Sequence, residues 1–479
     1  MQGSSYKYNG SIMMSLMLAG GLVGIILSVL IQNYILLLAI TTIPLFLLLA
    51  CYILKHPMTM YYLAFSLCYF AIAITKYFRI EGISYIVDGV VVFTIIFMLI
   101  FNNDIRELIE KTRNILLWSM IVWFIYSSFQ LANSTAVAGA WVSSRGVALN
   151  GILLTILTLV SITNFKQVKT LIFILSIFTS LAIAKTFMQI YWGWDYAEIE
   201  WLNSGGAKTH LIATGIRYFS FFSDAGNFGS NMGFAIVLFS IVGFYTKKKS
   251  LRIYYIVVSL LSLYALFLSG TRGAIAVPIA GFSALAFFSR KIKLIIPLTM
   301  MLILSFMFFR YTYIGQSNQH IRRIRTAFVD GANDASFSVR LNNQKMLADY
   351  LQNKPFGVGL GLSGVENKQY ANMLTTQIPH DSWYVKIWVE TGIVGLVLYL
   401  LFIVGAILQA GKRLMLNVRD PMIKFYLLGW LCGIFGLLVS AYGNAFWGQF
   451  PTNIIVFSGL ILAMNGKYFE KKLENVEKR

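Results

Sequence analysis

Long apolar runs without charge recur along the whole chain, and they restrict the folds that it can adopt. Each run approaches the roughly 20 residues that a helix needs to span about 30 Å of hydrocarbon. Only 12% of the residues are charged, about half of the fraction typical of a soluble domain, so lipid must cover much of the surface. The runs therefore predict an all-α polytopic membrane protein. Examples are Ser11–Ile31, Tyr34–Leu54, Val147–Thr163, Asn231–Tyr245 and Leu251–Leu268.

The apolar runs predict about fourteen membrane-spanning helices, and twelve or thirteen also fit their lengths. The first run is longer than the apolar core of a signal peptide, so we expect it to be retained as a helix. The whole chain, 1–479, is expected to form one membrane domain, with a first outer loop at 189–225 and a large one, containing short helices, at 311–382. The spans are expected at 12–31, 34–54, 60–75, 84–101, 115–132, 147–163, 168–188, 226–246, 252–269, 273–289, 293–310, 383–408, 424–445 and 451–465.

Basic residues in the short loops indicate which side of the membrane each loop faces. Short cytoplasmic loops of membrane proteins are rich in Lys and Arg. Alternation of the spans places all these basic clusters on one side, which is therefore predicted to be cytoplasmic and to hold both termini. The net charge of +20 follows in part from this rule and does not indicate nucleic acid. The clusters contain Arg106, Lys111, Arg113, Lys166, Lys169, Lys247, Lys248, Lys249, Arg252, Arg290, Lys291, Lys293, Lys412, Arg413, Arg419, Lys424, Lys467, Lys471, Lys472, Lys478 and Arg479.

The large outer loop also carries basic residues, against this trend. Long loops are exempt from the rule, so solvated charge and an anionic ligand are both open explanations. Arg217 and Arg272, at the ends of spans, favour the ligand, because an arginine at membrane depth costs roughly 2.5–3.5 kcal/mol unless it is paired or wet. Guanidinium groups also hold phosphate oxygens bidentately. The arginines and lysines of the loop are Arg310, Arg322, Arg323, Arg325, Arg340, Lys345, Lys354 and Lys368.

Arg340 is expected near the start of a helix inside this loop. Ser336 or Ser338 can cap that helix, which should run to about Gln352 and end before Pro355. Apolar residues for docking are Phe337, Leu341, Leu347 and Leu351. The glycines of the next segment, 355–361, allow close backbone approach. Neither a strand nor an acidic residue frames them as a dinucleotide site.

His380 stands where the large loop re-enters the membrane. A histidine there is suited to act as a general base near neutral pH, with Asp381 or a more distant carboxylate orienting the ring. The alternative is an interfacial histidine among the anchoring side chains of Trp383, Tyr384 and Trp388. No His, Asp or Glu cluster has metal-ligand spacing. The cysteines lie in apolar runs without a CxxC pair and are expected to be buried small hydrophobes; they are Cys51, Cys68 and Cys432.

Four segments occur in a fixed order along the chain: RYFSFFSDAGNFG, LSGTRGA, SVRLNNQKMLADYLQNKPFGVGLG and PHDSWYVKIWVETGIVGLVLY. Together they resemble the O-antigen ligase and polymerase family of bacterial envelope glycosyltransferases, over residues 215–400. The resemblance implies a helical enzyme of the bacterial inner membrane that acts on the outer face. Its donor would be a glycan on undecaprenyl diphosphate, and it would use no nucleotide sugar, metal or cofactor.

The resemblance also implies roles for individual residues. Arg217, Arg272 and Arg340 would bind the diphosphate, and His380 would be the catalytic base. The family often has Asn after the histidine, where this chain has Asp381, and Pro-Asn in the first motif, where it has Gly226-Asn227. Supporting roles would fall to Asp381, Asn227, Gly357 and Gly359.

Three functions remain open at this point. The first is a polymerase of lipid-linked repeat units. The second is a ligase that moves the finished glycan to lipid A core or another acceptor, which differs in acceptor and not in mechanism. The third is a flippase, for which Lys185 and Lys386 are the charged mid-span candidates, although no internal repeat is visible. Expected partners are the lipid bilayer, the glycan or lipid acceptor, a chain-length regulator and a flippase. Stacking on sugars or an interfacial belt explains Trp192, Trp194, Tyr196 and Trp201 equally well.

Overall fold

The computed structural model describes residues 34–79, 82–101, 105–212, 215–289, 292–329 and 335–477. The chain separates into two units, Met1–Met60 and Tyr61–Arg479. In the first unit the structure describes helix α2 (Tyr34–Lys55) and the start of α3. The expected span at 12–31 lies outside the described residues, as do the basic residues Arg290, Lys291, Lys478 and Arg479.

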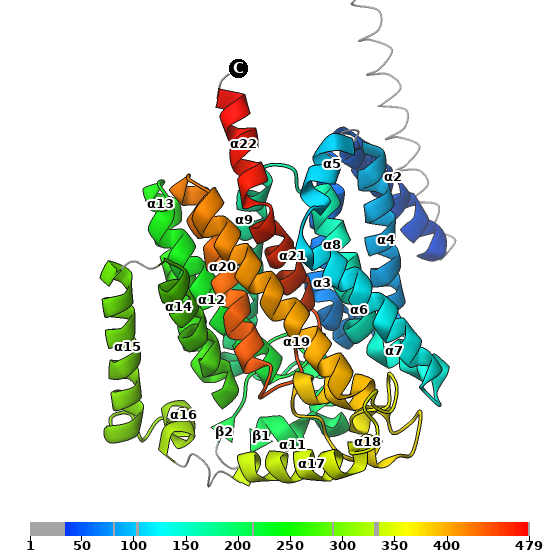
Figure 1. Ribbon diagram of the computed structural model, residues 1–479, viewed down its shortest axis with the longest axis vertical. Coiled ribbons are helices and arrows are strands. Elements are labelled where there is room, and N and C mark those ends of the chain that lie inside the picture. Colours follow the sequence, from blue (N-terminus) through cyan, green and yellow to red (C-terminus); the bar gives the residue numbers. More distant parts are fainter. Residues whose placement is uncertain are drawn as a thin grey trace, which may run out of the picture. The chain divides into compact units, whose positions relative to one another are not determined.

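Most of the described residues are helical, with one short strand pair among them (Figure 1), so the predicted all-α polytopic membrane class is confirmed. Nine described helices are long and apolar enough to cross a membrane, and the bent pair α7 (Val137–Ala148) and α8 (Asn150–Ser161) would make ten. The nine spans are α3 (Met58–Phe78), α4 (Ile83–Phe101), α6 (Ile115–Ala132), α9 (Phe165–Tyr191), α12 (Ala225–Tyr245), α13 (Lys249–Leu268), α14 with its preceding turn (Arg272–Ser289), α19 (Trp383–Asn417) and α20 (Pro421–Ser440).

Three further helices coincide with expected spans but are not among the nine described helices that are long and apolar enough to cross a membrane. One of them is α2. The other two are α15 (Ile292–Tyr311) and α21 (Thr452–Met464). Cys51 on α2 is exposed, whereas Cys68 and Cys432 are buried. The expectation that all three cysteines are buried was therefore wrong. The side chains around Cys51 are largely exposed too.

Helices α12 and α20 form the most deeply buried part of the second unit. Both pack against α14, and glycines let their backbones approach closely, as is common between membrane helices. A methyl group on Gly233 of α12 would lie 2.7 Å from Cβ of Val277, and one on Gly436 of α20 would lie 2.2 Å from the Val277 carbonyl oxygen. These contacts fix α12, α14 and α20 relative to one another.

The loops at 192–224 and 312–382 lie at one end of this bundle, which we call the loop face (Figure 1). The first loop contains α10 (Tyr196–Trp201), a π-helical turn (Leu202–Gly206), α11 (Ala207–His210) and a short antiparallel hairpin of β1 (Leu211–Ile212) and β2 (Gly215–Ile216). The second contains α16 (Gln319–Val329), α17 (Ala335–Leu351), a 3-10 turn (Val365–Asn367) and α18 (Leu374–Gln377). The opposite end carries α5 (Ile105–Thr112) and α22 (Gly466–Glu477).

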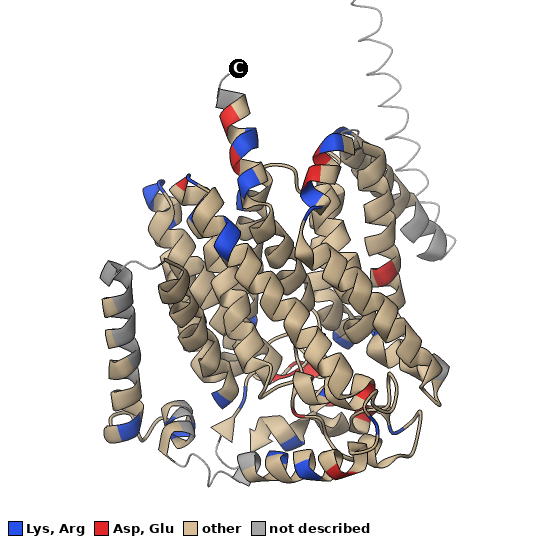
Figure 2. Cartoon of the chain, in the orientation of Figure 1, with Lys and Arg blue, Asp and Glu red and all other residues tan. Residues whose placement is uncertain are grey.

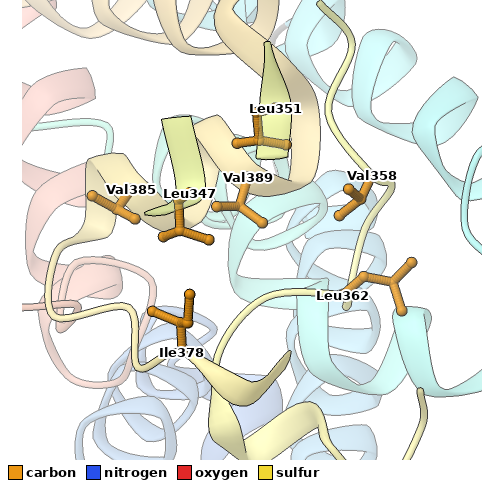
Figure 3. Packing of buried hydrophobic residues seen from close by; sticks show 7 residues of the cluster. All are labelled: Leu347, Leu351, Val358, Leu362, Ile378, Val385 and Val389. Atoms are coloured by element: carbon orange, nitrogen blue, oxygen red, sulfur yellow. The ribbon is translucent and has the colours of Figure 1, made fainter. Parts of the chain in front are cut away.

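Helix α17 occupies the range expected for the arginine-bearing helix. It docks through Leu347 and Leu351, whereas Leu341 is 38% exposed and does not join that core. Phe337 and Ser336 have side chains outside the described set. Figure 3 shows the docking cluster, which also joins α19 and the connecting segments; its members are Leu347, Leu351, Val358, Leu362, Ile378, Val385 and Val389.

Candidate active site

Arg217 follows the β1–β2 hairpin, and both of its ends are fixed. Its backbone N–H donates to the carbonyl oxygen of His210 at 2.9 Å. Its guanidinium donates to the carbonyl oxygen of Thr209 at 2.9 Å and to the hydroxyl of Thr271 at 2.8 Å. The Thr271 hydroxyl in turn donates to the carbonyl oxygen of Ala225 at 2.9 Å. Arg217 is thereby tied to the turn between α13 and α14.

Two more arginines lie at this turn. Arg272 belongs to it and donates from Nη1 to the Thr326 hydroxyl of α16, at 3.3 Å. Arg323 of α16 donates to the carbonyl oxygen of Gly270. A methyl group on Gly270 would lie 3.1 Å from Cδ of Arg323 and 3.4 Å from Cγ of Arg217, so glycine leaves room for both. Arg323 was grouped with the other basic residues of the loop, and nothing in its local sequence marked it as part of this cluster.

Arg340 of α17 completes the group. Its Nε lies 3.9 Å from Oδ2 of Asp381. A methyl group on Gly443 would lie 3.7 Å from Nη1 of Arg340 and 4.0 Å from Cα of Gly273, so Arg340 reaches the α13–α14 turn as well. Figure 2 shows Lys and Arg residues of α16 and α17 at the loop face.

The three arginines that the resemblance singled out are close enough to repel one another. Burial lowers the pKa of Arg217, Asp224 opposes this, and the positive charges of Arg272 and Arg340 lower it further. Burial raises the pKa of Asp381, and Arg340 opposes that effect. Positive charge gathered in this way is stabilised by an anion. The arginine cluster, which we define as Arg217, Arg272, Arg323 and Arg340, therefore has the electrostatics of an anion site.

His380 lies between the arginine cluster and a separate cavity. Its ring is 8% exposed, and Nε2 lies 3.2 Å from Oε1 of Glu366. Nδ1 is buried and has no hydrogen-bond partner among the described residues. It rests against Gly364, where a methyl group would lie 2.0 Å from Nδ1. Burial lowers the pKa of His380 well below its ordinary value, and Lys386 adds to this, so the imidazole is neutral near pH 7.

The carboxylate that contacts the ring is Glu366 and not Asp381. In an extended segment, successive side chains point to opposite sides. Accordingly, Asp381 faces Arg340, and His380 faces Glu366. The sequence left open whether Asp381 or a more distant carboxylate orients the His380 ring. In the structure it is the more distant one. Asp381 instead connects the peptide that carries His380 to the arginine cluster.

His380 lines a cavity of about 430 Å³, which we call the histidine cavity. Asp88, Arg145 and Lys386 line it as well, and both of these cations are paired with carboxylates. Nη1 of Arg145 lies 3.6 Å from Oδ2 of Asp88, and Nζ of Lys386 lies 3.1 Å from Oε1 of the buried Glu390. Arg145, Asp88 and Glu390 were missed from sequence, although a charge inside an apolar run is costly unless it is paired, and that is the signal that marks them.

Asn227 and the two supporting glycines hold the surrounding structure together. Asn227 is buried, and its amide donates to the Ser223 hydroxyl at 3.0 Å and to the Phe450 carbonyl oxygen at 3.2 Å. Gly357 and Gly359 have φ of +78° and +100°. Methyl groups there would lie 2.5 Å from the Gly392 nitrogen and 2.7 Å from the Ser134 nitrogen, respectively. The glycine segment thus lies directly on α19 and on the end of α6. Gly226, which stands where the first motif of the family often has proline, packs against Asn444.

His210 of the first loop and Lys185, the charged mid-span candidate for a flippase, serve local structure. His210 is buried, and its Nε2 accepts a hydrogen bond from the Ala225 N–H at 3.0 Å. Burial lowers the pKa of His210 to about 4. Lys185 pairs with Asp195 at 2.7 Å and with Glu198 at 3.0 Å. Within the described part of the chain, no three His, Cys, Asp or Glu side chains gather as metal ligands would.

The fold and this site define a polytopic helical membrane protein that gathers arginines and a buried neutral histidine at one end. Residues 257–400 match the family model described as O-Antigen ligase, which confirms the resemblance carried by the motifs. The matched segment contains Arg272, Arg340 and His380, and it begins after Arg217. The family match indicates a glycosyl-transferring enzyme of the O-antigen ligase or polymerase type. No curated protein matches the sequence.

Proposed function

We propose that the protein polymerises the repeat units of a cell-surface polysaccharide, such as an O-antigen, a capsule or an exopolysaccharide. The donor would be a glycan on undecaprenyl diphosphate, and the loop face would lie on the outer side of the bacterial inner membrane, with both termini cytoplasmic. The observation that carries this proposal is the convergence of Arg217, Arg272 and Arg340, from three separate segments, beside the peptide that bears His380.

The arginine cluster suits the leaving diphosphate. When the bond between the anomeric carbon and the diphosphate oxygen breaks, the electron pair stays on the diphosphate, so its negative charge grows. A charge about 4 Å from a guanidinium gains about 4 kcal/mol at an effective dielectric constant of about 20. Because the arginines are held before the donor arrives, this stabilisation acts mainly in the transition state. The proposed reaction is metal-independent, because the arginines supply the positive charge.

His380 suits the role of base. A proton on Nε2 would face Glu366 and leave the lone pair of the neutral ring on Nδ1, with the carboxylate orienting the base. Because Nδ1 is buried against Gly364, the acceptor hydroxyl would reach it only when the ring or the Gly364 segment shifts on binding. The acceptor hydroxyl would lose its proton to His380 as its oxygen attacks the anomeric carbon from the side opposite the diphosphate. Direct attack of this kind inverts the anomeric configuration.

The decisive experiment is glycan transfer by His380→Ala in purified, reconstituted protein with the lipid-linked repeat unit as donor. Removing a general base is expected to slow transfer by about 10²–10⁴-fold. His56→Ala is the matched control, because His56 is exposed, and it should turn over at the wild-type rate. Normal turnover by His380→Ala would eliminate His380 as the base.

The alternative within the same chemistry is a ligase that uses lipid A core or another acceptor. An assay with two lipid-linked repeat units supplied together distinguishes the polymerase from the ligase. A polymerase joins the units on one lipid, whereas a ligase leaves them separate until its own acceptor is added. No observation favours the third alternative, transport, since Lys185 and Lys386 are each paired with carboxylates.

A further inference from the structure

A second cavity, of about 580 Å³, lies beside the histidine cavity, and the two share Ile72 and Gln449 in their linings. Along α3 the second cavity reaches from Ile72 to Arg79, about 10 Å at the rise of an α-helix. Its far end is formed by Trp201 of α10 with Lys76, whose Nζ lies 4.6 Å from the centre of the Trp201 ring. The two cavities adjoin at Ile72 and Gln449, and together they are called the groove; His380 lines the first cavity and Trp201 lines the second.

The lining of this groove differs in kind from the arginine cluster. Most of its charges lie beside a charge of opposite sign: Arg145 pairs with Asp88, Arg79 pairs with Glu200, and Lys386 pairs with Glu390, which is not itself part of the lining. Of the other charged lining residues, Glu366 faces His380 and Lys76 lies over the Trp201 ring. The arginine cluster has positive charge in excess, but the groove offers neutral hydrogen-bonding groups and aromatic faces between ion pairs. Amides and aromatic rings are contributed by Asn150, Asn367, Gln369, Tyr370, Trp383 and Gln449. A ligand with many hydroxyls and little charge fits such a lining.

Gln449 stands at the junction and is held from behind. Its Oε1 accepts from the Ser223 hydroxyl at 2.6 Å, and the buried Asn227 lies beside it at 3.4 Å. The Gln449 amide nitrogen makes no hydrogen bond within the described part of the chain, so both of its hydrogens remain for a ligand. At the His380 end, Nη1 of Arg145 is buried without a hydrogen-bond partner among the described residues.

We propose that this groove binds the acceptor as an extended oligosaccharide, with the attacking hydroxyl at His380 and a more distant sugar at Trp201. The inference rests on the proposed function, in which His380 takes the proton of the acceptor hydroxyl. A base must lie within hydrogen-bond reach of that hydroxyl, and His380 lines this groove, whereas Asp381 faces the arginine cluster. The acceptor, and not the donor glycan, is therefore assigned to the groove.

The groove predicts that a longer acceptor binds more tightly. Glycan released from the lipid-linked donor by mild acid would be separated into one-repeat and several-repeat fractions. For wild-type protein, KM for the several-repeat fraction should be lower. Trp201→Ala should remove about two- to tenfold of that advantage, the value of one aromatic contact, and Trp201→Phe should restore it. Trp192→Ala is the matched control, because Trp192 of the same loop is 80% exposed and lies outside both linings.

Trp201 also packs on His210 and Phe219, so a second variant avoids that contact. Ala197 lines the same cavity, and Ala197→Trp should fill it, removing the length preference while the one-repeat acceptor reacts normally. The proposal is overturned if wild type shows no length preference, if the variants slow both acceptors equally, or if KM for the lipid-linked donor rises instead.

Equilibrium binding of the released glycan separates this inference from the proposed function. Length-dependent binding that Ala197→Trp abolishes supports the groove, even if the protein transfers no glycan. Transfer without length-dependent binding supports the proposed function and overturns the groove.

Discussion

Gly364 offers a test of His380 that leaves the imidazole itself in place. Gly364 has φ of +83°, and a methyl group on it would lie 2.0 Å from Nδ1 of His380. Ordinary contact begins at 3.4 Å, so in Gly364→Ala the ring must move by about 1.4 Å, the difference between these distances. Misplacement of a reacting group by about 1 Å can cost about 10²-fold in rate. We therefore expect Gly364→Ala to transfer glycan about 10²-fold more slowly.

The same substitution also strains the backbone, and a control separates the two effects. Gly364 has φ +83° and ψ +153°, a region almost restricted to glycine, where another residue costs about 1–3 kcal/mol in stability. Gly193 also has φ of +83°, but a methyl group there meets nothing within 4 Å. Gly193→Ala should therefore share the loss of stability, measured by thermal unfolding in detergent, and keep the wild-type rate.

Two outcomes would refute this reasoning. The first is a Gly364→Ala enzyme as fast as Gly193→Ala. The second concerns the double variant Gly364→Ala with His380→Ala. Because Gly364 acts through His380, the double variant should be no slower than His380→Ala alone. Additive losses would show that Gly364 acts by another route.

Two further predictions concern charge. Arg272→Lys and Arg340→Lys should each lose most transfer activity, because an ammonium does not bind a diphosphate bidentately as a guanidinium does. Lys345→Ala is the control, because Lys345 is exposed. Wild-type rates in both Lys variants would argue against diphosphate binding. In the pH profile of kcat/KM, burial lowers the pKa of His380, so the neutral base persists below the usual pKa of about 6.5 and is lost only as pH falls through the lowered value. An acid limb at or above that usual pKa would contradict the assignment.

Much of the architecture could be predicted from the sequence because the membrane imposes it. A span needs a fixed length free of unpaired charge, so the apolar runs located helices such as α12 and α20 directly. The end of α17 before Pro355 was as expected, whereas its start was not, because the helix begins at Ala335, ahead of both Ser336 and Ser338, which therefore do not cap it. Cys51 shows the limit of this reasoning, since an apolar run predicts contact with apolar surroundings and does not distinguish lipid from protein.

Less of the candidate site could be predicted from the sequence, because its contacts join segments that are distant in the chain. The three arginines came from a resemblance, and their proximity depends on how α17 and the hairpin fold back onto the α13–α14 turn. The choice of Glu366 over Asp381 depends on the direction of two consecutive side chains. Gln449 has no local signal at all, since its place follows from a buried amide, Asn227, far away in the sequence.

The consecutive residues His380 and Asp381 face two different sites, the groove and the arginine cluster. This arrangement has a consequence for how proteins of this kind diversify. On the proposed function, lipid carrier and growing polymer are recognised on opposite sides of a single peptide unit. Substitutions around Gln449 and Trp201 can then alter which sugar is accepted without disturbing the grip on a carrier common to many pathways. New surface polysaccharides could arise by exchanging one half of the recognition surface while the other half stays constant.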